Sequence, residues 1–382
     1  MLEFLNHIKT NRCGEIESRT VAPIRSLSGL SRRSFSIIKA LVITASLLLT
    51  NVVAAVETSS KTSAASALVP VDAFNYVRAK TALQFDKYLA RSGGKLNNFS
   101  HSRNVVGIDG QSSKRLNRDT LYSVAIVDIS QGATLIMPEF GDRYISVQVV
   151  NQDGFTNKIY HDGGEHSLTM QEFDTPYVWI LVRTLVFNSI AGDIEVANAL
   201  QDQMRVDSAS AKSYGHPDYD PVSFADTTAL LLELGKAIKD NSGAAGTKEQ
   251  VDPIKQLLLN AYGFGTLPQT ESLLISVEPN LPSDKAYTLN VKDVPVDGFW
   301  SLAMYNKNGY FEENKYSAYG FSNLTALKNA DGSITLHFGG DPDSVNYIPL
   351  TKGWNYVVRL YQPRAELLDG TWTFPEVQRI SN

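Results

Sequence analysis

An internal repeat constrains the fold of this chain more than any other feature of its sequence. The stretch from Asp142 to Phe155 aligns without gaps with the stretch from Asp297 to Tyr310. Aspartate, serine, asparagine and glycine recur identically, and most hydrophobic positions change only to similar residues. Alternating hydrophobic residues followed by an Asn-x-Asp/Asn-Gly sequence are typical of a strand that ends in a tight turn. Each copy therefore predicts one strand and one turn of the same kind.

A second apolar strand follows each copy of the repeat and ends in an arginine, Arg183 in the first half and Arg359 in the second. Two matching strand pairs far apart in the chain are most simply explained by two related β-domains. We expect Arg183 and Arg359 to pair with nearby carboxylates, such as Asp142 and Asp297, rather than to bind a substrate.

Helical patterns occupy the sequence before and between the two predicted β-domains. Residues 72–91 form an amphipathic stripe that ends at two glycines, and residues 192–263 contain three further stripes with helical spacing. The predicted fold class is α+β and rich in β-structure, with two related β-sandwich-like domains, a helical insert and an N-terminal helix. The expected boundaries are residues 70–190 for the N-terminal β-domain, 191–265 for the helical insert and 266–382 for the C-terminal β-domain.

The N-terminal residues predict an export signal. Arg32 and Arg33 stand just before an apolar stretch from Ala40 to Ala55, which ends in small residues suited to cleavage. We expect residues 1–55 to be a twin-arginine-type signal peptide and residues 56–69 a linker. An uncleaved membrane anchor and an ordinary secretory signal are the alternatives. The prediction places the mature chain in the periplasm or outside the cell, with no stable membrane anchor.

Charge and cysteine content exclude several classes of function. The chain has a formal net charge of −5, and its N-terminal 55 residues carry an excess of positive charge, so the mature part is more acidic still. Nucleic-acid binding normally needs a basic surface, and we therefore expect no nucleic-acid partner. The one cysteine, Cys13, lies in the predicted signal. The mature chain thus lacks disulfides, thiolate metal sites and cysteine nucleophiles.

A family resemblance supports this organisation. The segment from Leu116 to Ser130 resembles the signature strand of DUF1254, a domain of unknown function. Three segments of the C-terminal half resemble its usual companion, DUF1214: residues 297–305, 346–350 and 358–372. The resemblance covers roughly residues 70–380 and implies an exported or cell-envelope protein rich in β-sandwich structure. It implies no particular reaction.

The strongest candidate site lies at the start of one predicted strand. Asn117, Arg118, Asp119 and Tyr122 bring an amide, a guanidinium, a carboxylate and a hydroxyl together, which suits an anionic or polyhydroxylated ligand. Arg118 and Asp119 are the catalytic candidates. The competing interpretation is an Asx-turn with Arg118 in an ion pair. Neighbouring strand residues point to opposite faces, so both side chains share a pocket only if the segment is a turn.

A histidine-containing loop is the candidate metal site. His161 and His166 flank two glycines and two acidic residues, and two imidazoles with a carboxylate could hold zinc or iron. Their spacing fits no helical zinc motif, because the glycines oppose a helix. A solvated hairpin loop is the favoured interpretation, and the cofactor stays open.

The function favoured by these patterns is the binding of a small molecule or glycan through the β-domains of a cell-envelope protein. Aromatic residues on the predicted strands are the candidates for lining the site: Tyr122, Tyr144, Phe299, Trp300 and Tyr305. The chain lacks a nucleophile-elbow, phosphate-loop or dinucleotide motif. A periplasmic hydrolase or metal-dependent enzyme is the first alternative. A structural envelope assembly protein, with a homo-oligomer as its expected form, is the second.

Overall fold

The computed structural model describes residues 67–238 and 241–380. The predicted signal peptide and most of the predicted linker lie outside the described residues. No helix within the described part of the chain is both long enough and apolar enough to cross a membrane.

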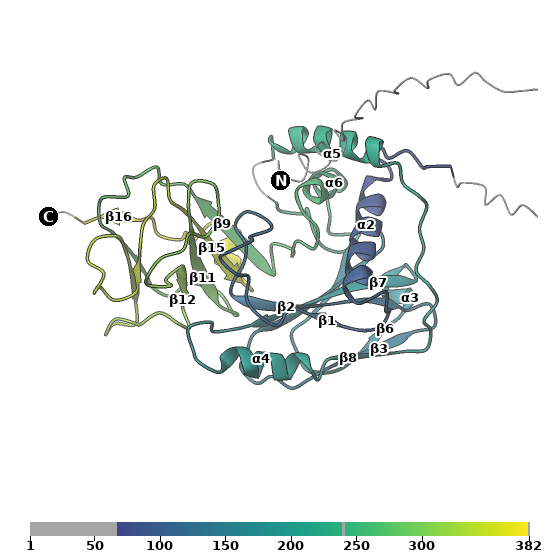
Figure 1. Cartoon of the computed structure of the whole chain (residues 1–382), viewed down its shortest axis with the longest axis horizontal. Coiled ribbons are helices and arrows are strands. Elements are labelled where there is room, and N and C mark those ends of the chain that lie inside the picture. The colour runs from purple at the N-terminus through teal and green to yellow at the C-terminus, as the bar shows by residue number, and fades with distance from the viewer. Residues whose placement is uncertain (1–66, 239–240, 381–382) are drawn as a thin grey trace, which may run out of the picture. The chain divides into compact units, whose positions relative to one another are not determined.

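The N-terminal β-domain consists of two sheets packed face to face (Figure 1). The larger sheet has the antiparallel order β1-β2-β7-β4-β5, and the smaller has the order β6-β3-β8. Between them lies a core that includes Val127, Leu135, Val147 and Ile180, each with an exposed fraction of 0%. The strands are β1 (Ser100–His101), β2 (Thr120–Asp128), β3 (Ala133–Met137), β4 (Ile145–Asn151), β5 (Thr156–Tyr160), β6 (Gly164–Leu168), β7 (Tyr177–Leu185) and β8 (Arg205–Ser208).

The C-terminal β-domain is a second two-sheet sandwich. Its sheets have the orders β12-β11-β15-β9 and β14-β13-β10-β16. They enclose a core that includes Leu289, Leu302, Leu336 and Val358. The strands are β9 (Ser272–Val277), β10 (Tyr287–Val291), β11 (Trp300–Tyr305), β12 (Gly320–Ser322), β13 (Ile334–Phe338), β14 (Tyr347–Ile348), β15 (Asn355–Tyr361) and β16 (Gln378–Arg379).

The two sandwiches share one topology. Strands β2-β7-β4-β5 of the first correspond, in both spatial and chain order, to β9-β15-β11-β12 of the second, and β6-β3-β8 correspond to β13-β10-β16. The repeat lies on β4 and β11, with the same register in each: Ser146 opposes Arg183, and Ser301 opposes Arg359. The predicted β-rich α+β fold with two related β-domains is confirmed.

The turn that ends the repeat is also the same in both copies. The Asn151 side-chain oxygen accepts hydrogen bonds from the backbone amides of Asp153 and Phe155, each 3.0 Å long. The Asn306 oxygen accepts the equivalent bonds from Asn308 and Tyr310 (2.9 and 3.2 Å). A glycine with positive φ closes each turn, and this conformation favours glycine over other residues.

Helices cover the outer face of the large N-terminal sheet. Helix α2 (Tyr76–Arg91) lies against this face, with Phe85 packed beside Trp179. Helices α5 (Pro221–Gly235) and α6 (Pro253–Tyr262) pack against α2, and Asp220 and Asp252 cap their N-termini. Figure 1 shows these three helices on one side of the sheet and α4 (Asp193–Gln201) on the other. The short helices α3 (Met170–Phe173) and α7 (Ala365–Leu368) lie in connections.

The segment expected to be a helical insert is thus not helical throughout. Its first third forms α4 and then β8, which pairs with β3 in the N-terminal sandwich. The helical spacing of residues 194–204 extends beyond the helix because Met204, past its end, is buried in the sandwich core.

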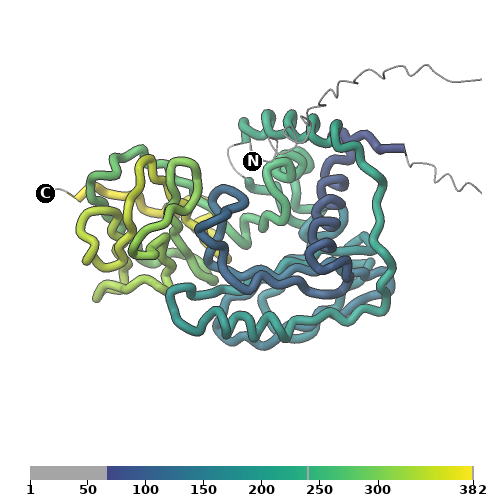
Figure 2. Tube along the Cα trace, in the orientation of Figure 1, coloured from purple at the N-terminus to yellow at the C-terminus, as the bar shows by residue number. Residues whose placement is uncertain are grey.

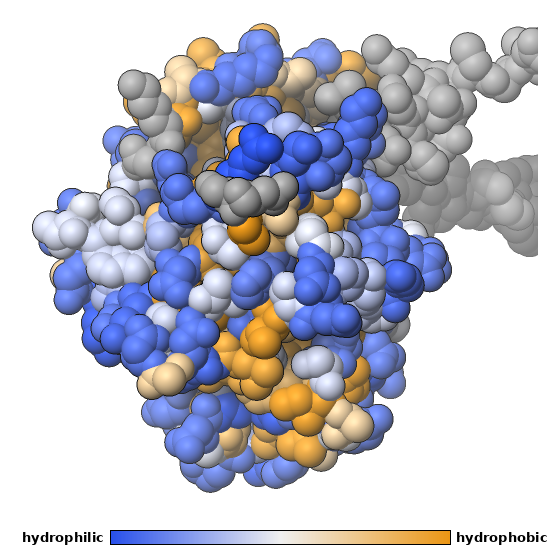
Figure 3. All heavy atoms as spheres, turned by 90° about the vertical axis from the view of Figure 1, so that its left-hand side faces the viewer, coloured by the Kyte–Doolittle hydropathy of each residue, from blue (hydrophilic) through white to orange (hydrophobic). Residues whose placement is uncertain are grey.

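The surface of the C-terminal β-domain mixes hydrophobic and hydrophilic side chains. Figure 3 shows this side of the molecule, with hydrophobic residues gathered between hydrophilic ones. Leu324, Leu327 and Val345 of this domain are 49%, 67% and 51% exposed. The predicted homo-oligomer stays a prediction.

Replacing the asparagine of each turn should reduce stability more at the buried turn than at the hydrated turn. Asn151 is 0% exposed and also donates to the Phe173 carbonyl (3.1 Å), whereas the Asn306 turn contains the exposed Asn308. Asn151→Ala should lower the free energy of unfolding by about 2–4 kcal/mol, because several buried polar groups lose their partner. Asn306→Ala should lower it by about 1 kcal/mol, because water can replace the lost acceptor. Urea denaturation measures both, and equal losses would contradict this account.

Candidate functional site

Equivalent residues of the two repeats meet where the two β-domains join. Tyr144 and Phe299 occupy the same repeat position, and their rings lie 5.2 Å apart. Each accepts a backbone hydrogen bond from the arginine-bearing strand, from Leu185 to Tyr144 and from Tyr361 to Phe299. All four side chains form one buried cluster. The domains therefore contact each other through corresponding surfaces, as two subunits do at an isologous interface.

The loop before β2 lies against the C-terminal β-domain and reinforces this contact (Figure 2). The Arg115 amide donates to the Gly309 carbonyl (2.7 Å), and the Gln111 side chain exchanges two hydrogen bonds with the backbone of Phe311. The Tyr305 hydroxyl donates to the Leu116 carbonyl (2.8 Å). These bonds fix the position of Asn117, Arg118 and Asp119, which follow in the chain.

Arg183 and Arg359, the arginines of the strands that follow the two repeat copies, line one cavity at this junction. We call it the two-arginine cavity. It has a volume of about 260 Å³. Arg183 opposes Tyr122 in the N-terminal sheet, and Arg359 opposes Leu274 in the C-terminal sheet, so strand alternation directs all four side chains away from the two cores. The lining residues are Arg115, Asn117, Tyr122, Arg183, Phe264, Gly265, Thr266, Leu267, Ser272, Leu274, Arg359 and Tyr361.

Arg359 is 5% exposed, and its guanidinium has incomplete hydrogen bonding. Its Nη2 donates to the carbonyls of Arg115 and Leu116 (2.8 and 3.3 Å) and to the Tyr305 hydroxyl (2.9 Å). Its Nη1 is buried and has no hydrogen-bond partner among the residues that the structure describes. Burial alone would lower the Arg359 pKa, but neighbouring Tyr305 and Asp119 raise it overall, so the side chain is charged.

Arg183 is 8% exposed and bonds to neutral groups. Its Nη1 donates to the Gln148 side-chain oxygen (3.0 Å), and its Nη2 donates to the Gly265 carbonyl (2.9 Å). Gly265 has a φ of +74°, and an added Cβ would lie 2.5 Å from the Trp179 ring, so glycine is required beside this arginine.

The prediction that Arg183 and Arg359 pair with Asp142 and Asp297 is wrong. Within the described part of the chain neither arginine lies within 4.0 Å of a carboxylate oxygen. Asp297 instead pairs with the exposed Arg364 (2.6 Å). The two aspartates precede their strands in loops, whereas the arginines lie within the sheets and face the junction.

Asn117 shapes the turn that enters the cavity. Its side-chain oxygen accepts a hydrogen bond from the Asp119 amide (2.9 Å), which makes the predicted Asx-turn. Its amide nitrogen donates to the hydroxyls of Tyr122 and Tyr361 (3.1 and 3.2 Å). Asn117 thereby connects aromatic residues of both β-domains on the cavity wall.

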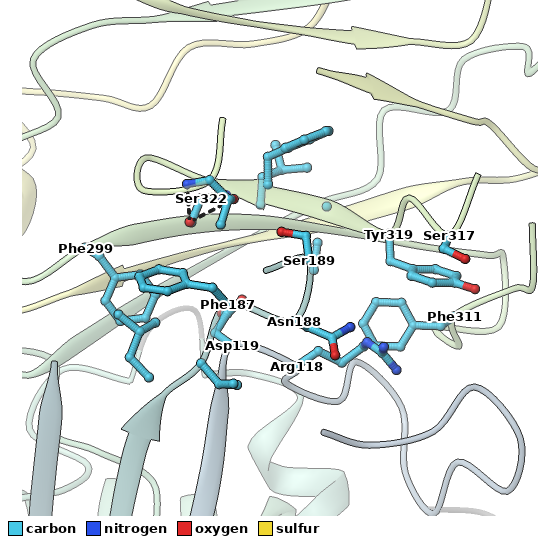
Figure 4. A pocket seen from close by; sticks show the side chains of 17 residues that line it. Arg118, Asp119, Phe187, Asn188, Ser189, Phe299, Phe311, Ser317, Tyr319 and Ser322 are labelled. Atoms are coloured by element: carbon cyan, nitrogen blue, oxygen red, sulfur yellow. Dashed lines mark hydrogen bonds between the residues drawn. The ribbon is translucent and has the colours of Figure 1, made fainter. Parts of the chain in front are cut away.

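A smaller cavity of about 130 Å³, which we call the Asp119 pocket, contains both catalytic candidates (Figure 4). Because the segment is a turn, Arg118 and Asp119 both line it. The Arg118 guanidinium donates to the Val106 carbonyl and lies over the rings of Phe311 and Tyr319, at 5.6 and 5.2 Å. Burial lowers the pKa of Arg118. Arg118 is thus held by a carbonyl and two aromatic rings, and within the described ranges it does not form the ion pair of the competing interpretation.

Asp119 links the two cavities electrostatically. The Ser301 hydroxyl donates to its carboxylate (2.6 Å), so the serine of the C-terminal repeat holds the turn of the N-terminal domain. Burial raises the pKa of Asp119, and the charge of Arg359 and the Ser301 bond offset only part of this rise. Asp119 therefore gives Arg359 a weaker counter-charge than an exposed aspartate would give.

Three predicted lining residues do not line either of these cavities. Trp300 lies in the C-terminal core against Phe374, because it occupies the inward-facing position of β11. Tyr305 contacts Arg359 but is covered by the loop at Leu116. Tyr144 packs in the junction, and burial raises the pKa of its hydroxyl to about 12. The prediction that Trp300 lines a binding surface is therefore wrong, because strand alternation turns its side chain into the core.

The two candidate metal ligands have different neighbours. His161 contacts the Ile145 carbonyl through Nδ1 (3.0 Å) and the Glu271 carboxylate through Nε2 (2.7 Å). His166 stacks on Tyr160 and contacts the Asp162 carbonyl (3.2 Å). Over the described ranges, no three histidine, cysteine, aspartate or glutamate side chains gather in a metal-binding arrangement.

Two family models match the chain. Residues 96–169 match the model described as Protein of unknown function (DUF1254), and residues 277–365 match Protein of unknown function (DUF1214). The chain carries a DUF1254 domain followed by a DUF1214 domain. The family resemblance expected from the sequence is thus confirmed.

Two solved structures are similar to this chain to different degrees. The VPA0106 protein from Vibrio parahaemolyticus matches with a TM-score of 0.64 and 17% identity over 81% of this chain and 98% of that one, which shows a shared fold. A putative uncharacterized protein from Burkholderia cenocepacia matches with a TM-score of 0.46 and 14% identity over 80% and 88% of the two chains. No curated protein matches this chain.

The two-arginine cavity draws on both domains of the family. The DUF1254 domain supplies Asn117 and Tyr122, and the DUF1214 domain supplies Arg359 and Tyr361. Arg183 lies between the two matched segments and was indicated only by the internal repeat.

The His161–Glu271 pair should make stability depend on pH. A carbonyl and a carboxylate can only accept hydrogen bonds, so the geometry suits a doubly protonated His161. Burial lowers the His161 pKa, but the hydrogen bond and charge of Glu271 raise it overall. The stabilisation should therefore be complete below about pH 6.5, the unfolded-state pKa, and be lost as pH rises through the folded-state pKa. Glu271→Gln should lower the free energy of unfolding by about 1 kcal/mol at pH 5.5 and by less at pH 8.5.

Urea denaturation at the two pH values measures this difference. His337→Gln is the matched control, because the His337 ring bonds the Val345 carbonyl (2.6 Å) and forms no carboxylate pair within the described residues. An equal loss at both pH values for Glu271→Gln would show that the pair does not titrate as described.

Proposed function

We propose that this chain is exported by its twin-arginine-type signal and binds a small molecule or glycan at the junction of its DUF1254 and DUF1214 domains. One observation supports the binding role above all others: corresponding arginines from both domains line a single cavity. Cavities between domains are common places for ligand sites, because each domain contributes a rigid wall. Asn117 and Tyr122, two residues expected from the sequence to bind a ligand, line the same cavity.

The chemistry of the lining suits recognition of a polar ligand. Guanidinium, amide and phenol groups can all donate hydrogen bonds, and Phe264, Leu267 and Leu274 provide apolar contact area. Hydrogen bonds that the arginines donate to backbone carbonyls, at Gly265 for Arg183 and at Arg115 and Leu116 for Arg359, position both side chains before any ligand arrives. A preorganised site of this kind loses little conformational entropy on binding.

Closing the cavity should abolish binding. Leu274 is 48% exposed and opposes Arg359 on the neighbouring strand, so Leu274→Trp should fill the cavity mouth without removing a buried charge. Native mass spectrometry of the mature chain purified from its own host should show an added mass that the variant lacks. Leu327→Trp, at an exposed position outside the cavity, is the control. A ligand bound equally by both variants would place the binding site elsewhere, and a bare wild-type chain that no small molecule stabilises against heat would refute the binding role.

Export should depend on the arginine pair of the predicted signal. Changing Arg32 and Arg33 together to lysine should abolish most of the processed chain in the periplasm, because the twin-arginine signal is recognised through this pair. Arg25→Lys, which changes an arginine outside the pair, should be exported normally. Immunoblotting of cell fractions measures the processed chain. Unchanged export of the double variant would assign the chain to the ordinary secretory route.

A further inference from the structure

We propose that the ligand of the two-arginine cavity is a small organic anion whose carboxylate or phosphate group is held between Arg183 and Arg359. This inference rests on the proposed binding function and narrows it to one chemical class. It is carried by three features of the cavity: its incompletely compensated charge, its unused guanidinium donor and its size.

The first feature is positive charge that no carboxylate contacts directly within the described residues, because the buried Asp119 near Arg359 offsets only part of it. Removing a guanidinium from water is costly unless an anion or enough acceptors replace the water. Arg115, at the edge of the cavity, has such a partner in Glu278 (2.7 Å). Arg183 and Arg359 are more deeply buried, yet within the described residues they contact only neutral acceptors. A bound anion would supply counter-charge beyond the part that Asp119 provides.

The second feature is the unused donor of Arg359. Its Nη2 makes three contacts, whereas its buried Nη1 makes none. Buried polar atoms of folded proteins normally have a partner, and such an exception at a cavity indicates a ligand or water position. Oxyanions match the planar arrangement of guanidinium donors better than neutral hydroxyl groups do. Because Nη1 has almost no exposed surface, an anion reaches it only when neighbouring side chains shift.

The third feature is the limited room. The cavity has a volume of about 260 Å³. This volume suits an organic acid or a small phosphate ester with a short body against Phe264, Leu267 and Leu274. A longer ligand, such as an extended glycan chain, would project beyond the cavity.

Matched ligands that differ in charge test the inference on the mature full-length chain. Succinate and benzoate are compared with succinamide and benzamide, and inorganic phosphate represents the oxyanion without an organic body. Isothermal titration and thermal shift should show binding of the acids and little or no binding of the amides. Tighter binding of phosphate than of the carboxylates would identify a phosphate group as the preferred oxyanion. Tighter binding of the carboxylates would identify a carboxylate group instead.

Single arginine variants then locate the binding. Arg183→Gln and Arg359→Gln should each weaken the binding of the best anion by about tenfold to a hundredfold, because each removes charged hydrogen bonds. Arg364→Gln, at an exposed arginine paired with Asp297, should bind as the wild type does. If Arg359→Gln fails to fold, Arg359→Lys keeps the charge but loses the planar donors, and it should still weaken binding.

The outcomes separate this inference from the proposed function. Amides that bind as well as the acids, with binding lost in Leu274→Trp, would overturn the anion class and leave the cavity as a binding site. Anion binding unaffected by either arginine variant would overturn the inference as well. A chain that binds none of these anions, yet releases a neutral molecule purified with it, would exclude the anion class while supporting the proposed function.

Discussion

The register between the repeat strand and its arginine-bearing partner determines most of this structure. In each β-domain a serine of the repeat opposes an arginine, and the residues on either side of that arginine point into the sandwich core. The same register therefore gives both domains an outer face with an arginine on it. When the two outer faces meet, corresponding residues contact each other and both arginines are enclosed at the junction. The cavity is a consequence of duplicated strand pairing.

Enclosing two guanidinium groups opposes folding, and the structure shows what offsets that cost. Carbonyl groups of Gly265, Arg115 and Leu116 accept hydrogen bonds from the arginines, and the domain junction buries aromatic surface around them. The carbonyls at Arg115 and Leu116 come from the loop that crosses to the C-terminal β-domain. Association of the two domains thus supplies the carbonyl acceptors of Arg359. The stability of the junction therefore depends on the same hydrogen bonds that position this arginine in the cavity.

The sequence predicted local features such as strands and turns well. It did not predict which surfaces of the two β-domains contact each other. The alternation around Asn151 and Asn306 predicted strand and turn, and Asn117 made its expected Asx-turn, because neighbouring residues decide such features. The same alternation shows that Arg183 and Arg359 face away from the cores, but it does not show what covers them. That depends on how two domains pack, so the sequence led us to assign them nearby carboxylates. The prediction that Trp300 lines a binding site is wrong because Trp300 shares the inward face of β11 with Leu302 and Met304.

The duplicated halves are not equivalent in detail, and their differences suggest separate roles for the two arginines. Both Nη atoms of Arg183 have neutral protein partners, and Tyr122 lies opposite it. Arg359 has one unused Nη atom, and the shorter, apolar Leu274 lies opposite it. A ligand oxygen could therefore bind Nη1 of Arg359 without displacing a protein hydrogen bond once neighbouring side chains shift to expose it, whereas at Arg183 it must share donors already in use. Arg359 is accordingly the principal anchor of a bound anion, and Arg183 supplies mainly charge.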